Sequence, residues 1–257
     1  MAKKDQDRIL AVRQQVNEQR RREAAAAKRR RLITQLSVIG GIVAIAAVIV
    51  GLVFMFRDSQ VPQVPTAEPT TITVGSNNAV PMEIQEHGVK IGAADAKVSL
   101  EIYEDFSCPH CANYHAQIGS TLTQLVADGK VTIQYNPINI VTKYGERAGS
   151  TAACVAVNEP NKWYQLRGSL FDIHDANTDA WGYTGFRDYL SQLGYSNETL
   201  SCVTDARYAS WIRGNTDAAR QAGITSTPTL KINGEAVELV PGDILVQLVD
   251  GLIADAS

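Results

Sequence analysis

The sequence predicts an α/β fold that carries an inserted α-helical domain and is preceded by one transmembrane helix. Three observations predict it. Positions 32–56 hold no charged residue. From about residue 82 onwards, strand-like and helix-like patterns follow one another, with a long helical stretch between two groups of strands. Two cysteines, Cys108 and Cys111, stand where a clear strand pattern changes into a helix pattern.

The charge of the chain is divided along its length. The 257 residues carry a formal net charge of −3, but residues 1–31 are strongly basic and residues 57–257 are acidic. A basic segment can bind nucleic acid, and such segments often hold aromatic residues as well. Residues 1–31 hold none and lie directly before the apolar run, so we expect a cytoplasmic segment that sets topology and no nucleic-acid partner.

The run from Leu32 to Phe56 is the predicted membrane anchor. It is longer than the roughly 20 apolar residues that a transmembrane helix needs. The alternative is a cleavable signal peptide, whose apolar region would span only about 7–15 residues. Basic residues at 28–31 precede the run, so the positive-inside rule places the N-terminus in the cytoplasm and the domain that follows the run on the outer side of the cell membrane.

Residues 57–81 contain four prolines and several threonines and few large apolar side chains, which predicts an extended linker. We expect the folded domain over residues 82–257. Its predicted elements are strands over 83–91 and 97–104, a helix over 109–127, a strand over 131–140, a helical insertion over about 144–222, strands over 229–233 and 236–240, and a last helix over 243–254.

Local patterns justify these elements in turn. The strand over 97–104 places Val98, Leu100 and Ile102 on one face. The helix over 109–127 begins with a proline, which the first turn tolerates, and continues as an apolar stripe. Asn233 and Gly234 between two strand patterns give the strongest short hairpin signal.

Cys108 and Cys111 enclose Pro109 and His110 at the start of the predicted helix. Thiol–disulfide exchange needs a thiolate, and the free N–H groups and dipole of a helix N-terminus stabilise one. Cys111 lies one turn further in, where it can resolve a mixed disulfide. His110 can place a positive or hydrogen-bonding group near the Cys108 sulfur. We interpret the two cysteines as a redox-active pair.

A Cys-x-x-Cys pair can also be half of a zinc site, which needs four ligands. Cys154 and Cys202 are isolated in the sequence, and we expect His115 at the surface. We therefore expect neither a metal nor another cofactor. Four cysteines allow three connectivities. If Cys108 pairs with Cys111, the other two can form a structural disulfide; two free buried thiols or a second relay pair are the alternatives.

Thr227 and Pro228 directly precede a predicted strand. Proline cannot donate a hydrogen bond to a central strand ladder, and an X–Pro bond adopts the cis form at small energetic cost. A cis Pro228 would turn the Thr227 backbone outward, where a substrate peptide could pair with it. Taken alone, the two residues indicate a turn; together with the cysteine pair, they indicate a second part of the site.

The sequence resembles the DsbA-like thiol–disulfide oxidoreductases, in particular the membrane-anchored type of Gram-positive bacteria. The matching segments are residues 105–111 (DFSCPHC), 223–229 (GITSTPT) and 232–234 (ING), and the resemblance covers about residues 82–257. It implies a thioredoxin fold with a helical insertion, Cys108 as nucleophile, Cys111 as resolving cysteine and a cis Pro228 facing them. It also implies oxidation of cysteines in exported proteins and reoxidation by a membrane-embedded, quinone-linked partner.

One position departs from this family. Its members often carry a buried acid six residues before the first cysteine, and that position here is Ile102. Glu101 and Glu104 flank it, and we expect both on the opposite face of the strand. No buried carboxylate can therefore be assigned beneath the cysteine pair from the sequence, which leaves water or another group for proton transfer at Cys111.

Two other functions remain open at this point. The first is a disulfide isomerase or reductase on the same scaffold. Isomerases usually dimerise through an added domain, and the sequence shows none, so we expect a monomer. The second is a redox-inert binding or chaperone module that keeps only the fold.

Overall fold

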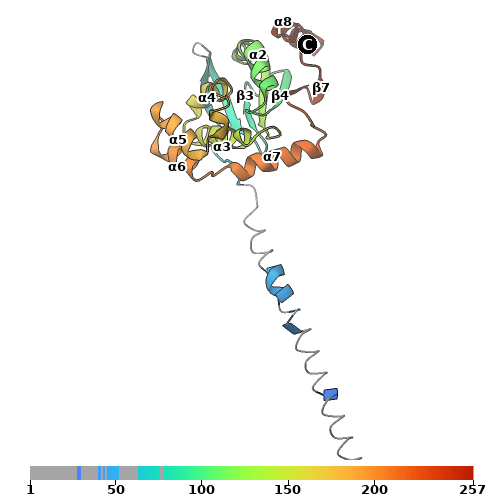
Figure 1. Ribbon diagram of the computed structural model, residues 1–257. Helices are drawn as coiled ribbons and strands as arrows, with labels where there is room; N and C mark the ends of the chain where they lie inside the picture. Colours follow the sequence, from blue (N-terminus) through green and yellow to red (C-terminus); the bar gives the residue numbers. More distant parts are fainter. Residues whose placement is uncertain are drawn as a thin grey trace, which may run out of the picture. The chain divides into compact units, whose positions relative to one another are not determined.

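Figure 1 shows a computed structural model of the chain, which describes residues 28–29, 40–41, 43, 45–51, 63–75 and 78–256. The chain divides into two compact units, Met1–Val61 and Pro62–Ser257. Among the described residues, no helix is both long enough and apolar enough to cross a membrane. Most of the basic segment 1–31 and part of the expected anchor at 32–56 lie outside the described residues.

The described residues of the second unit form a sheet of seven strands in the order β1-β2-β3-β5-β4-β6-β7. Strands β4 and β5 run parallel, and the other neighbouring pairs run antiparallel. The strands are β1 (Thr70–Val74), β2 (Asn78–Ile84), β3 (Val89–Ile91), β4 (Val98–Glu104), β5 (Val131–Pro137), β6 (Thr229–Ile232) and β7 (Glu235–Val237).

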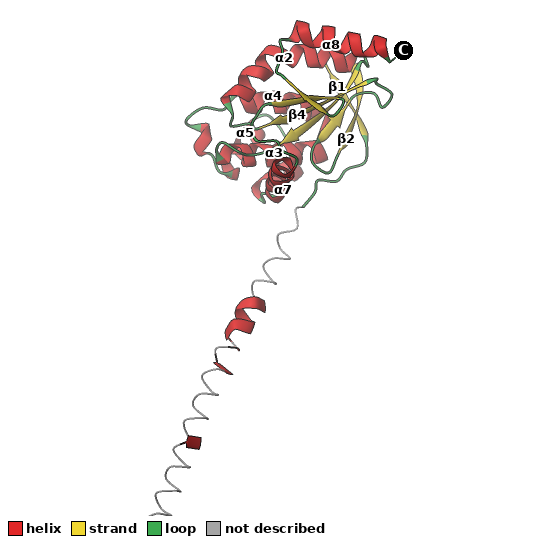
Figure 2. Ribbon diagram, turned by 90° about the vertical axis from the view of Figure 1, so that its right-hand side faces the viewer, coloured by secondary structure: helices red, strands yellow, loops and turns green. Residues whose placement is uncertain are grey.

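Helices cover both faces of this sheet. Helices α2 and α8 pack together on one face, while α7 covers the other, as Figure 2 shows. The helices are α2 (Pro109–Ala127), α3 (Lys143–Asn158), α4 (Pro160–Asp172), the short 3-10 helix η2 (Thr178–Ala180), α5 (Tyr183–Gln192), α6 (Asn197–Thr204), α7 (Ala209–Gln221) and α8 (Gly242–Asp255).

Strand β4 shows how the sequence divides the two faces. Its residues Val98, Leu100 and Ile102 are buried, and Ile102 lines a small space together with residues of α2. Because side chains alternate along a strand, Glu104 shares that face. Glu101 and Tyr103 point to the opposite face, where they lie near residues of α7.

Residues 70–74 and 78–81 belong to strands, so the expectation of a linker is wrong for these two segments. β1 and β2 pair as an antiparallel hairpin in which Thr70 is opposite Met82. Ile72, Val74 and Val80 are buried against the rest of the core. Threonine and proline are common in linkers, but alternating β-branched and aliphatic residues also suit a half-buried strand, and here the alternation prevails.

The remaining expected elements are largely confirmed. Helices α3 to α7 occupy the helical insertion predicted over about 144–222. The strand predicted over 83–91 is split, because a turn at Gln85–Gly88 separates β2 from β3. Asn233 and Gly234 both adopt positive φ angles, 50° and 84°, as a tight hairpin between β6 and β7 requires.

Candidate functional site

Cys108 lies at the junction of β4 and α2, where it is the N-cap residue of the helix. Pro109 occupies the first helical position, where its missing N–H is not needed. No side chain caps the helix, and its first turn contains no acidic residue. The free N–H groups of that turn are therefore available to the Cys108 sulfur.

Cys111 is buried one turn further along α2, and both cysteines are free thiols in this structure. The exposed fraction is 5% for Cys108 and 2% for Cys111. Burial raises the pKa of the Cys111 thiol far above its usual range, and the hydrogen bond that its sulfur accepts from the Asp105 N–H only partly opposes this effect. Cys111 thus remains a protonated thiol at neutral pH. The two cysteines also differ in position, because Cys111 lies inside α2 and Cys108 lies at its N-terminus.

The Thr227–Pro228 peptide bond is cis, as the sequence predicted. The Cys108 thiol donates a hydrogen bond to the carbonyl oxygen of Thr227, with 3.4 Å between sulfur and oxygen. Pro228 lines the same small space as Cys111. The fold therefore brings together the start of α2 and the start of β6, which are more than a hundred residues apart in the chain.

A buried carboxylate does lie beneath the cysteine pair, and it is Glu104. Its exposed fraction is only 3%, and its carboxylate pairs with the Arg167 guanidinium of α4, with Nε 2.7 Å from Oε1 and Nη2 bonded to Oε2. The Arg167 guanidinium carbon also lies 3.8 Å from the centre of the Tyr135 ring. The expectation that Glu104 lies on the face opposite Ile102 is wrong, because the two residues are two positions apart on β4 and share one face.

The protonation state of the Glu104 carboxyl depends on its ion pair with Arg167. Burial raises the pKa of its carboxyl, and the Arg167 guanidinium opposes that rise. Arginine stays charged in proteins, so the pair keeps a permanent positive charge beside the carboxyl. Glu104 in turn helps to raise the pKa of Cys111. The acid, the guanidinium and the resolving thiol all line one small space.

His115 is a second residue that the sequence placed incorrectly, since it is partly buried rather than at the surface. Its ring stacks on Phe171 at a centroid distance of 5.3 Å, and its Nδ1 lies 3.4 Å from Nη1 of Arg167. Burial, together with the nearby guanidinium, lowers the pKa of His115 to about 4. The ring is therefore neutral at physiological pH and can accept the guanidinium hydrogen bond.

Asp105 fixes the shape of the loop that carries the cysteines. Its buried carboxylate accepts hydrogen bonds from Ser107 N and Oγ at 2.8 and 2.6 Å, and from the backbone N–H groups of Ile140 and Val141 at 2.7 and 2.9 Å. A Cβ on Gly145 would lie 2.1 Å from its Oδ1, so only glycine fits there. The apolar side chains of Ile140 and Val141 are exposed on this linked loop.

Pro109 and His110 are exposed at the start of α2. Among the described residues, the His110 ring has no hydrogen-bond partner, so it is free to contact a bound polypeptide. The structure thus brings together the six residues that the sequence assigned to the site: Cys108, Pro109, His110, Cys111, Thr227 and Pro228.

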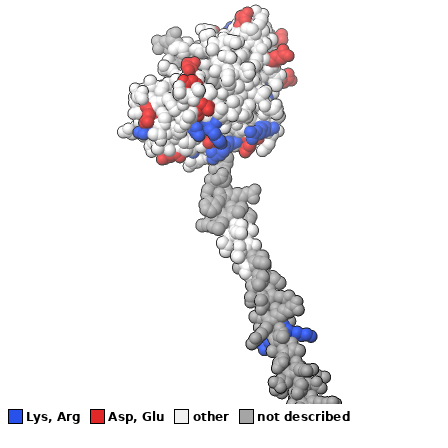
Figure 3. Space-filling model, viewed as in Figure 1, with Lys and Arg blue, Asp and Glu red and all other residues white. Residues whose placement is uncertain are grey.

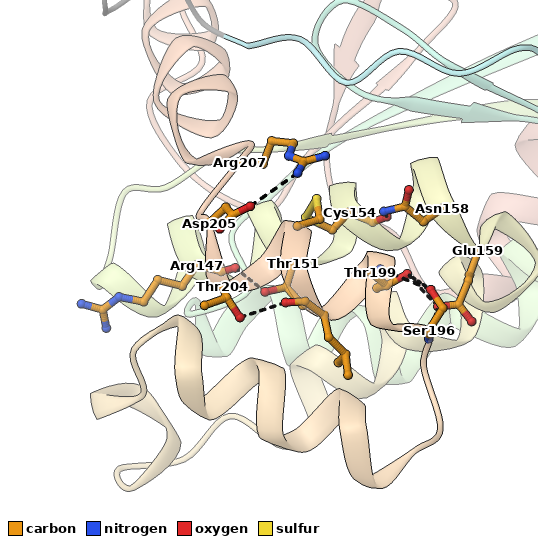
Figure 4. Close-up of a disulfide and its surroundings, with 12 residues drawn as sticks. Arg147, Thr151, Cys154, Asn158, Glu159, Ser196, Thr199, Thr204, Asp205 and Arg207 are labelled. Carbon is orange, nitrogen blue, oxygen red and sulfur yellow. Dashed lines mark hydrogen bonds and ion pairs between the residues drawn. A yellow bond between two sulfur atoms is a disulfide. The ribbon is translucent and has the colours of Figure 1, made fainter.

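Cys154 and Cys202 form a disulfide with an S–S distance of 2.08 Å. Both residues are fully buried, and the bond joins α3 to α6 within the helical insertion, as Figure 4 shows. Close to this bond, Glu159 Oε2 accepts hydrogen bonds from Ser196 N and Thr199 Oγ1. The predicted pairing is confirmed, and the alternative of two free thiols is wrong.

The described residues include no group of three or more His, Cys, Asp or Glu side chains that could hold a metal ion. The face of the folded unit drawn in Figure 3 is largely uncharged, with acidic side chains scattered over it and basic ones gathered at one edge. This face does not have the broad basic surface that binding to a nucleic-acid backbone requires.

Comparison with known proteins places this geometry in a family. A family model described as Thioredoxin matches residues 85–250. A Rickettsia prowazekii protein named as a protein-disulfide oxidoreductase is 23% identical over 210 residues, which are 79% of this chain and 72% of that protein.

Solved structures share the fold. DsbA from Mycobacterium tuberculosis in its reduced form has a TM-score of 0.58 and 22% identity, covering 65% of this chain and 92% of that one. MdbA from Corynebacterium diphtheriae, a thiol-disulfide oxidoreductase, has a TM-score of 0.59 and 20% identity, covering 72% and 95%. The family match spans more than half of the chain and includes Cys108, Cys111 and the cis Pro228, so the chain belongs to the thioredoxin family and has the fold of the DsbA-type enzymes.

Proposed function

We propose that this protein is an extracytoplasmic thiol–disulfide oxidoreductase that introduces disulfide bonds into exported proteins through Cys108 and Cys111. One observation carries the proposal. The Cys108 sulfur lies between the uncapped N-terminus of α2 and the carbonyl oxygen of Thr227, with the buried thiol of Cys111 one turn away. This arrangement places a nucleophile, a resolving thiol and a peptide-binding backbone segment at one point.

The reaction transfers two electrons and two protons. In the oxidised enzyme, a substrate thiolate attacks the sulfur of Cys108, the Cys108–Cys111 bond breaks, and a mixed disulfide forms between substrate and Cys108. A second substrate thiolate then attacks the substrate sulfur and releases Cys108. The substrate gains a disulfide, and the enzyme is left as the dithiol, which is the state of this structure.

The direction of electron flow follows from which enzyme form is more stable. A disulfide is a strong oxidant when its reduced form is stabilised. The higher reduction potential of DsbA than of thioredoxin illustrates this relation. Here the Cys108 sulfur lies at the uncapped N-terminus of α2 and donates a hydrogen bond to the Thr227 carbonyl oxygen, while burial raises the pKa of Cys111 and keeps its sulfur as a neutral thiol. These contacts stabilise the reduced form, which supports an oxidase.

Three observations support an outer location with the N-terminus in the cytoplasm. Residues 32–56 contain no charge, basic residues precede them, and the folded unit contains the Cys154–Cys202 disulfide, which is typical of oxidising compartments. Labelling of intact cells with a membrane-impermeant thiol reagent, after reduction with a membrane-impermeant phosphine that opens the Cys108–Cys111 disulfide, tests this location. Modification of Cys108 without lysis is the expected result, and modification only after lysis would contradict it.

Each catalytic cycle leaves a dithiol, so the enzyme requires an electron acceptor. A membrane-embedded, quinone-linked reoxidase is the proposed partner, because an anchor at Leu32–Phe56 would hold the domain close to the membrane. The protein is proposed to act as a monomer on unfolded, cysteine-containing substrates.

The activity is tested with the purified, oxidised chain and a reduced, unfolded protein as substrate. We expect stoichiometric transfer of the disulfide and loss of transfer in Cys108→Ala. With a disulfide-bonded substrate, Cys111→Ala should give a trapped mixed disulfide, because its Cys108 thiolate attacks a substrate disulfide, releases one substrate thiol, and has no second cysteine to displace it. Transfer that persists in Cys108→Ala would refute the assignment. A stable dimer in light scattering, together with repair of scrambled disulfides, would instead favour the isomerase.

A further inference from the structure

A cavity of about 350 Å³ lies on the face of the sheet opposite the cysteine pair. Ligand sites commonly enclose about 300–1,000 Å³. Its floor is formed by two adjacent pairs on the parallel strands β4 and β5: Glu101 is opposite Gln134, and Tyr103 is opposite Asn136. The floor thus presents four polar side chains in register.

Small side chains on α7 account for the space above this floor. Ala218 and Ala219 of α7 and Ala222, the C-cap residue that follows the helix, line the cavity. Longer side chains at these positions would reach the strands and fill the gap. Ile138 adds an apolar wall, while His87 and Asn215 of α7, with 3.2 Å between His87 Nδ1 and Asn215 Oδ1, add polar side chains to the lining. The cavity thus combines a polar floor with polar and apolar walls, as small-molecule sites often do.

Asn136 provides a hydrogen-bond donor without an acceptor. The residue is 2% exposed, and its Oδ1 accepts a hydrogen bond from Gln134 Nε2 at 2.8 Å. Its Nδ2 is buried and has no partner among the described residues. Because a buried N–H group without an acceptor is unfavourable, the cavity suits a molecule that brings an oxygen acceptor to this point.

Glu101 provides the opposite chemistry. The Tyr103 hydroxyl donates to its Oε2 at 3.2 Å, and burial raises the pKa of Tyr103 to about 12, so the hydroxyl keeps its proton at neutral pH. No hydrogen bond to Oε1 is formed by the described residues. The carboxylate can therefore accept a further, cationic donor.

We propose that this cavity binds an α-ammonium group with a carbonyl oxygen beside it, the ammonium on Glu101 and the carbonyl on Asn136. The two residues are diagonal neighbours on adjacent parallel strands, and the usual strand spacing and rise then place their Cα atoms about 8 Å apart. An aminoacyl unit fits between side chains at that spacing. A free amino acid and the amino terminus of a peptide share this chemistry.

A bare metal ion does not match these groups. Asn136 offers an N–H donor to the cavity, whereas a cation needs acceptor atoms. The site also uses none of the residues assigned to the redox reaction. Binding is therefore measurable whether or not the proposed oxidase activity is correct.

Calorimetry and ligand-observed NMR with the purified full-length chain test the proposal. Alanine amide carries both required groups, and N-acetylalanine amide lacks the ammonium. We expect saturable binding of alanine amide and at least about tenfold weaker binding of the acetylated probe, because a charge-assisted hydrogen bond is lost. Tighter binding of free alanine than of trialanine amide would identify free amino acids as the ligand, and the reverse order would identify peptide amino termini.

Two variants locate the binding. Ala218→Leu fills the cavity from α7 and should abolish binding, whereas Gln221→Leu on the exposed part of the same helix should leave it unchanged. Glu101→Gln keeps the shape of a half-buried side chain and should weaken alanine amide by about tenfold.

The proposal is overturned if alanine amide shows no saturable binding up to about 10 mM, if the acetylated probe binds equally well, or if Ala218→Leu binds as the unaltered chain does.

Discussion

Replacement of Arg167 by Met tests whether the guanidinium stabilises the buried carboxyl of Glu104. The two side chains are 4% and 3% exposed, and Met fills much of the space of the arginine stem. The change removes both hydrogen bonds to Glu104 and the contact with the Tyr135 ring. It leaves an acid in the core without its partner.

The expected loss of stability is large for a single residue. Breaking a buried ion pair by removing one partner costs about 3–5 kcal/mol, because the other charge stays buried. An exposed pair contributes only about 0–1 kcal/mol. Arg187, which pairs with Asp188 at the surface, is the matched control, and Arg187→Met should therefore have little effect.

The loss should also depend on pH in a defined direction. Arg167 opposes the rise in the pKa of Glu104, so its removal raises that pKa further. A carboxyl whose pKa is higher in the folded than in the unfolded state stabilises the fold below the unfolded value, about 4.3, and loses this contribution as pH rises. The difference between Arg167→Met and the unaltered chain should thus be smaller at pH 5 than at pH 8.

Urea unfolding followed by circular dichroism at both pH values measures this difference. The double variant Glu104→Leu/Arg167→Met removes both charges and should recover most of the lost stability. A loss below about 1 kcal/mol in Arg167→Met, equal at both pH values, would refute the reasoning, since it would match an exposed pair.

Three further predictions concern the disulfide, a titrating ring and the cysteine loop. Replacing Cys154 and Cys202 by Ala opens a loop with a sequence separation of 48 and should lower the unfolding free energy by about 4 kcal/mol in denaturant titrations; a change under about 1 kcal/mol would contradict a stabilising role. Because the pKa of His115 falls to about 4 in the folded state, folding favours the neutral ring, and stability should decline as pH drops from about 6.5 towards 4. Thermal unfolding curves of His115→Gln should lack this part of the decline, and a pH profile identical to that of the unaltered chain would contradict the role of His115. Asp105→Asn replaces one acceptor oxygen by a donor and should speed hydrogen exchange of the amides of residues 140–141; unchanged exchange would show that the carboxylate does not hold the loop.

Much of the site could be predicted because its chemistry is local in the sequence. Cys108 and Cys111 lie at a strand-to-helix junction that the hydrophobic pattern marks clearly, and Pro228 marks the start of β6. The extent of the helical insertion and the hairpin at Asn233 follow from similarly strong local signals.

The residues that surround the pair depend on tertiary contacts, which local patterns do not report. Glu104 belongs to the face of Ile102 by strand alternation alone, so its burial could have been found by correct application of the two-residue period. Its partner Arg167 could not have been found, because α4 meets β4 only in the folded protein. The same holds for His115, which is buried by Phe171 of that helix.

The hairpin of β1 and β2 was missed for a related reason. Its composition suits an extended linker. The pairing of β2 with β3 joins the hairpin to the sheet, and only this tertiary contact shows that Ile72 and Val80 are buried in the core.

The reduction potential of the Cys108–Cys111 pair tests the central claim most directly. It can be measured by equilibrating the purified chain with glutathione buffers and quantifying the dithiol. An oxidase built on a stabilised reduced form should have a potential well above that of thioredoxin, towards about −120 mV. A value at or below about −270 mV, that of thioredoxin, would contradict the proposed oxidase.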